Sequence, residues 1–249
     1  MSKALIVAGM HRSGTSLVAN MIHSSGIPMG DELLPPDVGN PLGYFEDVEI
    51  HDFHRVLLRR AGVRDAFTVT ESDVPIVVDD EARDHAVQFA ERRSSRPQWG
   101  WKEPRTSLFL DLWNGVLADK TFLFLFREPT AVLDSLLRRA SNDSVNKDPV
   151  VGLRLWRIYN EHILRFAKAH PDLCILAETN RFIRSPDAVA GALALRGFDV
   201  DPGRIGDVFV EDAFHVEVRM RARRVAKKNR DEGRRCAELY AELRAVSLP

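Results

Sequence analysis

The chain has 249 residues, 45% of them hydrophobic, and its 35 basic and 36 acidic side chains leave a formal net charge of −1. This length and composition suit one large domain, residues 1–249, with a sizeable buried core. The near-neutral balance argues against a nucleic-acid partner and against binding to a membrane surface.

Cys174 and Cys236 are the only cysteines in the sequence, which excludes a disulfide framework and a cysteine-rich zinc site. Every apolar run falls short of the roughly 20 residues that a membrane span needs. Gly9 interrupts the first apolar run before it reaches the length of a signal peptide. We therefore expect a cytoplasmic protein with no membrane span.

Residues 4–21 read ALIVAGMHRSGTSLVANM and predict a strand, a tight turn and a helix. The short apolar run at residues 5–7 is typical of a strand buried on both faces of a parallel sheet. Gly9 and Gly14 bracket the turn, and apolar residues then recur at helical spacing up to about Gly26. A helix that starts near Gly14 directs its positive end and the N–H groups of the loop toward a common point. We therefore predict that this loop binds a phosphate group.

The residue after Gly14 separates two chemistries. A kinase or nucleotide triphosphatase of the P-loop class has a lysine there, followed by a hydroxyl residue that binds magnesium. Here the position is Thr15, while Arg12 places a cation inside the loop. This arrangement suits a ligand with less charge than a triphosphate. A P-loop kinase or nucleotide triphosphatase with a degenerate loop is the alternative.

The segment GMHRSGTS, residues 9–16, resembles the 5′-phosphosulfate loop of sulfotransferases, which use 3′-phosphoadenosine 5′-phosphosulfate (PAPS) as donor. The arginine inside the loop is similar to that of the tyrosylprotein and bacterial members. The resemblance implies a P-loop-like sulfotransferase architecture and a catalytic Arg12. It also implies that the loop binds the donor, through His11, Arg12, Ser13, Gly14, Thr15 and Ser16.

Residues 26–45 are rich in proline and glycine and predict a long irregular loop that shapes the acceptor site. The loop ends at Glu46 and Asp47, which open a helical pattern, so both carboxylates have a simple role in complementing the helix dipole. The resemblance implies a second role, because several sulfotransferases use a glutamate after the first helix as the general base. Glu46 is then the catalytic base, with His51 and His54 as alternatives because histidine titrates near neutral pH.

Residues 59–96 carry little pattern beyond an apolar run at residues 74–78 and a predicted helix over residues 80–92. Charged residues are spread through the rest of this stretch without a helical or strand period. We interpret it either as a solvated surface helix with its connections or as an insertion that shapes the acceptor site.

Residues 99–113, WGWKEPRTSLFLDLW, form a second informative motif. Proline restricts the preceding Glu103 to an extended conformation, so Lys102 is predicted to end a strand and a helix to begin near Thr106. Ligands of open α/β sheets bind at the carboxyl ends of the strands, which places Lys102 beside Arg12. The motif resembles the Lys-x-Pro turn of tyrosylprotein and heparan-type sulfotransferases, whose lysine lies close to the transferred sulfate. The resemblance implies a catalytic Lys102; a surface lysine in a tight turn is the alternative.

Residues 122–126 form an unbroken apolar run that predicts a central strand. Arg127 follows this strand, and Ser135 lies eight residues later within the next predicted helix. A guanidinium fork and a hydroxyl can hold one anion from two sides. In sulfotransferases an arginine and a serine at this separation hold the 3′-phosphate of PAPS, which implies that role for Arg127 and Ser135. A salt bridge at the end of the strand is the alternative for Arg127.

The C-terminal part predicts an amphipathic helix over residues 148–168, a strand over residues 173–177 and a further helix. Thr179, Asn180 and Arg181 replace the Tyr-Glu-Asp of a family element, so we infer no adenine contact there. From Phe214 onward the chain is strongly basic, which usually marks a solvated helix face. Family members close the donor site with such a segment, and the candidates for a 3′-phosphate contact are Arg221, Arg223, Arg224 and Lys227.

The order of elements predicts an α/β fold with a mainly parallel central sheet flanked by helices. With the resemblance it implies a PAPS-dependent sulfotransferase that moves a sulfuryl group in line to a hydroxyl or amine of a small-molecule, carbohydrate or peptide acceptor. Positioning and charge neutralisation carry such a transfer, so no metal is expected. The rival predictions are a P-loop kinase or nucleotide triphosphatase, and a non-enzymatic nucleotide-binding protein.

Overall fold

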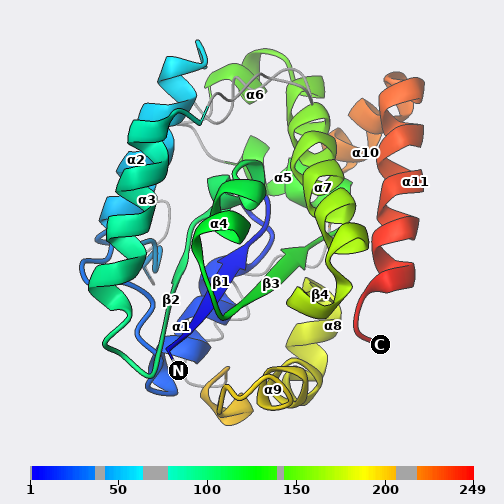
Figure 1. Cartoon of the computed structure of the whole chain (residues 1–249). Coiled ribbons are helices and arrows are strands. Elements are labelled where there is room, and N and C mark those ends of the chain that lie inside the picture. The colour runs from blue at the N-terminus through cyan, green and yellow to red at the C-terminus, as the bar shows by residue number, and fades with distance from the viewer. Residues whose placement is uncertain (1, 37–42, 64–77, 139–142, 206–217) are drawn as a thin grey trace.

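The computed structural model describes residues 2–36, 43–63, 78–138, 143–205 and 218–249. Within these residues, four parallel strands form one sheet in the order β2-β1-β3-β4, with helices packed around it (Figure 1). The strands are β1 (Lys3–Ala8), β2 (Gln98–Lys102), β3 (Lys120–Phe126) and β4 (Cys174–Glu178). The predicted α/β fold with a parallel central sheet is confirmed.

The register of the sheet brings the carboxyl ends of its strands to one edge. Val7 of β1 lies opposite Lys102 of β2, and Phe126 of β3 lies opposite Glu178 of β4. Because all four strands run in the same direction, the residues that follow them gather at this edge. The predicted loop at residues 9–16, Lys102 and the segment that starts at Arg127 therefore lie on the same side of the molecule.

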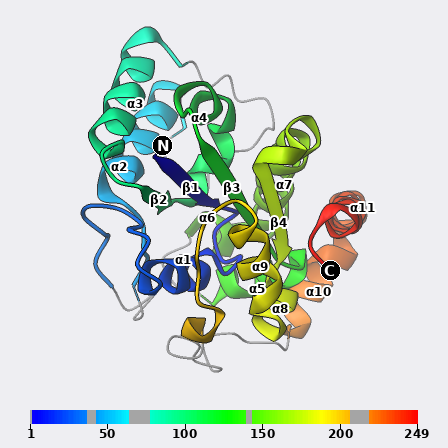
Figure 2. The same cartoon turned by 60° about the horizontal axis from the view of Figure 1, so that its bottom comes forward.

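Helices cover both faces of the sheet because side chains alternate between the faces along each strand. Leu5 and Val7 face a core shared with α1 (Thr15–Ser24), α8 (Thr179–Arg184) and α9 (Pro186–Ala194). On the other face, Ile6 and Phe124 pack with α2 (Val48–Arg60), α3 (Asp80–Arg93), α4 (Leu110–Val116), α7 (Val150–Ala169) and α11 (Arg230–Val246). Figure 2 shows α1, α8 and α9 on the side opposite α3 and α4. The remaining helices are α5 (Pro129–Leu137), α6 (Asp143–Lys147), α10 (Met220–Lys228) and the short 3₁₀ turns Pro104–Leu108, Pro171–Leu173 and Pro202–Ile205.

Several predicted elements differ from the structure at their boundaries. The helix expected near Thr106 is a 3₁₀ turn over Pro104–Leu108, and α4 begins only at Leu110. The Trp101 indole N–H donates to the Thr106 hydroxyl at 3.1 Å. This hydrogen bond holds the turn against β2, and the α-helix begins only after the turn. Residues 74–77 of the apolar run lie outside the described residues. The helix predicted over residues 80–92 is confirmed as α3.

The start of α2 corrects the prediction that Glu46 and Asp47 open the helix. Asp47 is the N-cap residue, and its carboxylate accepts from the N–H of Ile50 at 3.1 Å. Glu46 lies outside the helix, where its backbone forms a parallel bridge with Lys102 at the edge of β2. The helix dipole therefore accounts for Asp47 and does not account for Glu46.

A buried arginine holds the irregular loop and the start of α2 against α3. The Arg93 guanidinium lies 2.7 Å from Asp31, 3.2 Å from Asp47 and 3.4 Å from Glu49, and its side chain is only 3% exposed. The N–H of Gly100 also donates to Pro28 at 2.8 Å, so the loop runs along the outer edge of β2. These contacts fix the position from which Glu46 reaches the sheet edge.

Candidate functional site

The loop between β1 and α1, residues 9–14, has the backbone of an anion-binding turn. Gly9 has φ +150°, and a Cβ there would lie 2.2 Å from the carbonyl oxygen of Leu125, so only glycine fits against β3. Arg12 and Gly14 have φ values of 71° and 80°, in the left-handed region. Gly14 is the N-cap of α1, whose first N–H groups have no intrahelical partner. The loop therefore presents backbone donors at the positive end of a helix.

Two hydroxyl residues, one beside this loop and one within it, have different roles. The Thr179 hydroxyl lies 2.5 Å from the carbonyl oxygen of Ser13 and 2.9 Å from that of Phe126, so it ties the loop to the end of β3. The Ser13 hydroxyl is buried and makes no hydrogen bond within the described part of the protein. A buried hydroxyl at the start of a helix fits the oxygens of a phosphate. The role of Thr179 was not predicted from the sequence, where this residue was noted only as a departure from the family pattern.

The loop is joined directly to α5. Arg12 Nε donates to the Ser135 hydroxyl at 2.9 Å, which brings together two residues predicted to bind the donor. Arg127 follows β3 with only 6% of its surface exposed, and its carbonyl oxygen accepts from the Trp156 indole N–H at 2.9 Å. Burial lowers the pKa of Arg127, while Glu128 and other carboxylates oppose that shift. Convergence of Arg127 and Ser135 on one ligand stays a prediction.

Glu46 and Lys102 form a buried ion pair at the ends of the strands. Lys102 Nζ lies 2.7 Å from Glu46 Oε1, with the two side chains 1% and 8% exposed. Burial lowers the pKa of Lys102, whereas Glu46 and Glu103 oppose that shift. Lys102 and Glu46, which were predicted separately from two motifs, are therefore in direct contact. They lie at the edge of the sheet where the loop begins.

His54 lies in the core, with both ring nitrogens engaged inside the protein. The Trp113 indole N–H donates to His54 Nε2 at 2.9 Å, and Nδ1 lies 2.7 Å from Glu103 Oε2. Because an indole N–H can only donate, we assign the lone pair to Nε2 and the proton to Nδ1. Burial lowers the pKa of His54, so the ring is neutral. This arrangement favours Glu46 over His54 as the residue that accepts a proton from an acceptor.

His51 and His11 lie on different sides of this cluster. His51 is on α2, where its Nδ1 lies 2.9 Å from the Asp52 carboxylate and its side chain is 15% exposed. His11 is in the loop, and its ring meets Tyr159 of α7 edge to face at 6.0 Å. His51 is therefore oriented by a neighbour on its own helix, and His11 packs between the loop and α7.

Glu103 and Arg105 were not predicted as site residues. Glu103 is fully buried and ion-paired with Arg105. Burial alone would raise the pKa of Glu103, but Arg105 and the hydrogen bond from His54 outweigh it and lower the pKa to about 2. The sequence does contain a signal for this pair: opposite charges flank Pro104 directly after Trp99 and Trp101. Charged residues beside a strand end packed with tryptophans have little access to water, so they are expected to pair with each other.

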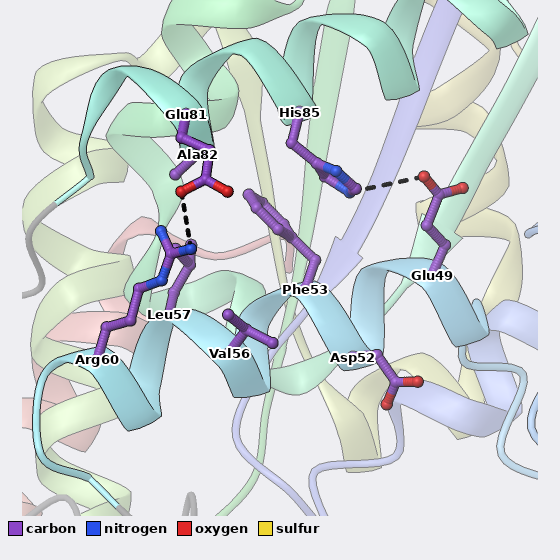
Figure 3. A pocket seen from close by; sticks show the side chains of 9 residues that line it. All are labelled: Glu49, Asp52, Phe53, Val56, Leu57, Arg60, Glu81, Ala82 and His85. Carbon is purple, nitrogen blue, oxygen red and sulfur yellow. Dashed lines mark hydrogen bonds and ion pairs between the residues drawn. The ribbon is translucent and has the colours of Figure 1, made fainter.

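A groove lies between α2 and α3, and its wall carries stacked rings of Phe53 and His85, 4.6 Å apart at 23° (Figure 3). Ion pairs drawn in the figure join Arg60 to Glu81 and His85 to Glu49. The groove has a volume of about 340 Å³ and is lined by Glu49, Asp52, Phe53, Val56, Leu57, Arg60, Glu81, Ala82 and His85. The helix α3 thus packs on the core and also forms a groove wall.

The basic C-terminal helix α10 packs against α5 through its buried Ala222. The candidate cations Arg221, Arg223, Arg224 and Lys227 are all exposed on α10. Residues 214–217 of the basic segment lie outside the described residues. A contact of any of these cations with the 3′-phosphate stays a prediction.

Two general features of the described ranges complete the site. No group of three or more histidine, cysteine, aspartate or glutamate residues is arranged there to hold a metal ion. None of the helices described has the length and the apolar content for crossing a membrane. Cys174 and Cys236 are buried and free, and burial raises the pKa of each thiol to about 12, so neither is a reactive thiolate.

Comparison with known proteins places the fold of this chain among known folds. No protein-family model matches the chain, and no curated protein matches it. Solved structures of sulfotransferase domains, however, superpose on nearly the whole chain. The chain therefore has a bacterial-type sulfotransferase fold, as the resemblance of its motifs implied.

Three of these structures show how far the likeness extends. The sulfotransferase domain of the Synechococcus PCC 7002 olefin synthase has 18% identity and a TM-score of 0.50 over 89% of this chain and 86% of that one. The sulfotransferase domain from the curacin biosynthetic pathway has 14% identity and a TM-score of 0.50 over 92% and 97%. Sulfotransferase STF9 from Mycobacterium avium has 15% identity and a TM-score of 0.53 over 88% and 69%.

Proposed function

We propose that this protein is a PAPS-dependent sulfotransferase acting on a hydroxyl or amine of a small-molecule, carbohydrate or peptide acceptor. One observation carries the proposal: the buried Glu46–Lys102 pair and the Arg12–Ser135 hydrogen bond both extend from the edge of the sheet where the glycine-bounded loop lies. An anion loop, an additional cation and a carboxylate are the groups that a sulfuryl transfer needs.

The donor is held by two anion-binding positions. The Ser13 N–H donates to the Met10 carbonyl oxygen at 3.1 Å, so the N–H groups of residues 14–16 with the hydroxyls of Ser13, Thr15 and Ser16 would hold its 5′-phosphate. Ser135 and Arg127 would hold its 3′-phosphate. The Arg12–Ser135 contact supports this division, because it links the two positions in one continuous polar surface. A single bisphosphorylated nucleoside then bridges loop and α5.

The transfer is an in-line displacement at sulfur. The acceptor oxygen or nitrogen forms a bond to sulfur, the bond from sulfur to the bridging oxygen of the donor breaks, and its electron pair stays on the 5′-phosphate. Glu46 takes the proton of the acceptor. Arg12 and Lys102 neutralise the negative charge that spreads over the sulfuryl oxygens and the leaving phosphate. Once Glu46 is protonated its hold on Lys102 weakens, so the ammonium is released toward the leaving group.

A labelling experiment tests the proposal without knowledge of the acceptor. Purified protein is incubated with PAPS carrying a radiolabelled sulfuryl group and an extract of the source cell, and labelled products are identified by mass spectrometry. We expect a labelled product that requires active protein. Arg12→Ala and Lys102→Ala are each expected to lower its rate at least about 100-fold, as loss of a preorganised charge does elsewhere. The exposed Arg59 on α2 supplies the control Arg59→Ala. If Arg12→Ala and Lys102→Ala both form product as fast as Arg59→Ala, neither Arg12 nor Lys102 has the proposed catalytic role.

A further inference from the structure

One peptide unit of the glycine-bounded loop is held from the end of β4. Thr179 directly follows β4, and its hydroxyl lies 2.5 Å from the carbonyl oxygen of Ser13 and 2.9 Å from that of Phe126. A hydroxyl has a single proton to donate and a carbonyl can only accept, so the two carbonyls share that proton, with the shorter contact at Ser13. Thr179 is fully buried, so water does not compete for this hydrogen bond.

We propose that Thr179 is a positioning residue that aims the Gly14 N–H at the 5′-phosphate of the donor. It acts by holding the Ser13 carbonyl, which belongs to the same peptide unit as the Gly14 N–H. The proposal rests on the proposed function for the identity of the anion. It assigns to Thr179 no contact with donor or acceptor.

The geometry of the peptide unit connects the two groups. The peptide between Ser13 and Gly14 is trans, and in a trans peptide the C=O and N–H bonds point in opposite directions within one plane. With the Ser13 carbonyl directed at Thr179, the Gly14 N–H points away from Thr179. Gly14 is the N-cap of α1, and its N–H donates to no other group within the described ranges. This N–H is therefore directed to an anion at the positive end of α1.

The conformation of the loop explains why an outside contact is needed. Arg12 and Gly14 have φ values of 71° and 80°, and the left-handed region is unfavourable for a residue with a side chain such as Arg12. The Ser13 N–H donates to the Met10 carbonyl oxygen at 3.1 Å inside the loop. The carbonyl of Ser13 is then the group that has to be held from outside, and Thr179 supplies that contact.

Thr179 is itself held by the sheet and by α8. Glu178 lies opposite Phe126 in the register of β4 and β3, which places the next residue beside the end of β3. Glu178 is also the N-cap of α8, and its carboxylate accepts from the N–H groups of Asn180 at 3.3 Å and Arg181 at 3.2 Å. The backbone is therefore fixed on both sides of Thr179, which gives its hydroxyl one position.

A selective NMR label observes the Gly14 N–H directly. The sequence contains two Ser–Gly steps, Ser13–Gly14 and Ser25–Gly26, so cell-free protein with ¹³C-carbonyl serine and ¹⁵N-glycine gives only these two amide signals. Titration with inorganic phosphate is expected to move the Gly14 signal in the wild type. The Gly26 N–H donates to the His23 carbonyl oxygen at 3.0 Å, so its signal is the internal control and should stay in place. A Gly14 signal that does not respond to phosphate would overturn the proposal.

Thr179→Val removes the hydroxyl and keeps the branched shape of the side chain. The phosphate concentration at the midpoint of the Gly14 titration is expected to rise about tenfold, because the N–H loses its fixed direction toward a charged group. Thr179→Ser keeps a hydroxyl and is expected to restore most of the lost affinity. If Thr179→Val does not fold, Thr179→Ala takes its place, because its smaller side chain puts no extra methyl group against the two carbonyl oxygens.

A matched control separates positioning from a merely structural role. Thr106→Val also removes the hydroxyl of a fully buried threonine, one that accepts from the Trp101 indole N–H at 3.1 Å. Both substitutions are expected to lower the free energy of unfolding in urea, but only the change at Thr179 should weaken phosphate binding. A phosphate midpoint that rises no more in the Thr179 variant than in Thr106→Val would overturn the proposal.

Nucleotides separate the 5′ end of the donor from its 3′ end. In calorimetry, the same Thr179 variant is expected to weaken binding of adenosine 5′-phosphate about tenfold and that of adenosine 3′-phosphate less than about threefold. An equal loss for both nucleotides would show that Thr179 acts through Phe126 and the adjacent Arg127, which would overturn the assignment to Gly14. If the wild type binds neither nucleotide but the phosphate titrations behave as expected, the proposed function fails and the role of Thr179 in anion binding stands.

Discussion

Removing Glu46 leaves the Lys102 ammonium buried without the carboxylate that it contacts at 2.7 Å. Breaking a buried ion pair from one side costs about 3 to 5 kcal/mol, because one charge is left uncompensated. With side-chain exposures of 1% and 8%, water cannot replace the lost partner. Glu46→Ala and Lys102→Ala are therefore each expected to lower the free energy of unfolding by about 3 kcal/mol or more.

The double variant distinguishes this reasoning from a simple loss of packing. Glu46→Ala with Lys102→Ala leaves no uncompensated charge, so its cost is expected to be at least about 2 kcal/mol smaller than the sum of the two single costs. Urea unfolding measures the free energies of unfolding of the two single variants and the double variant, compared at a constant m-value. The exposed pair Lys168–Glu242, at 2.8 Å with both side chains 55% exposed, is the control and should couple by less than about 1 kcal/mol. Additive costs at the buried pair would refute the reasoning.

The deficit of Glu46→Ala also has a predicted pH dependence. Burial lowers the pKa of Lys102 from its usual 10.5, and loss of Glu46 lowers it further. Between that lowered pKa and 10.5 the unfolded chain binds a proton that the folded chain does not, so stability rises with pH. The deficit relative to the wild type is therefore expected to be full at pH values below the lowered pKa of Lys102 in the variant and to shrink as the pH rises through that pKa. A deficit that grows with pH would contradict this sign.

Three further predictions concern other parts of the site. Ser135→Ala is expected to weaken binding of adenosine 3′,5′-bisphosphate about tenfold and Arg127→Ala more strongly, since both lose hydrogen bonds to a charged group; calorimetry measures both, and unchanged affinity would exclude the 3′-phosphate position. Gly9→Ala is expected to lower the free energy of unfolding by at least about 2 kcal/mol, because its Cβ would lie 2.2 Å from the Leu125 carbonyl oxygen. A free energy of unfolding in urea equal to that of the wild type would show that the loop shifts to make room. The pKa of Glu103 falls from 4.5 to about 2 on folding, so its contribution to stability is present above pH 4.5 and is lost as the pH falls through 2. Between these pH values the free energy of unfolding of Glu103→Gln should therefore fall by about 3 kcal/mol less than that of the wild type.

Local sequence patterns were sufficient for the sheet and the loop. The apolar runs at residues 5–7 and 122–126 became β1 and β3, because an uninterrupted run of this length fits a strand covered on both faces. Gly9 and Gly14 marked the turn, and both are required by backbone conformation or close contact. Parallel strands then bring Lys102 and Arg127 to one edge without any further information.

The partners of the site residues could not be read from local patterns. Glu46 reaches Lys102 through an irregular loop, so their contact spans 56 residues and has no periodic signal. His54 follows Phe53 on the apolar face of α2 and looks like an ordinary core position, yet it contacts Glu103 across 49 residues. Ser135 was expected to share a ligand with Arg127, which stays a prediction, but its hydrogen bond to Arg12 was not predicted. These contacts depend on how separate elements pack, which spacing along the chain does not encode.

The most direct test of the donor assignment is calorimetry of the wild-type protein with adenosine 3′,5′-bisphosphate in the absence of magnesium. We expect binding at least about tenfold tighter than that of ATP with magnesium, because the 3′-phosphate adds hydrogen bonds to charged groups that ATP lacks. Tighter binding of ATP with magnesium, or no binding of the bisphosphate, would contradict the proposal that this loop and α5 hold a sulfuryl donor.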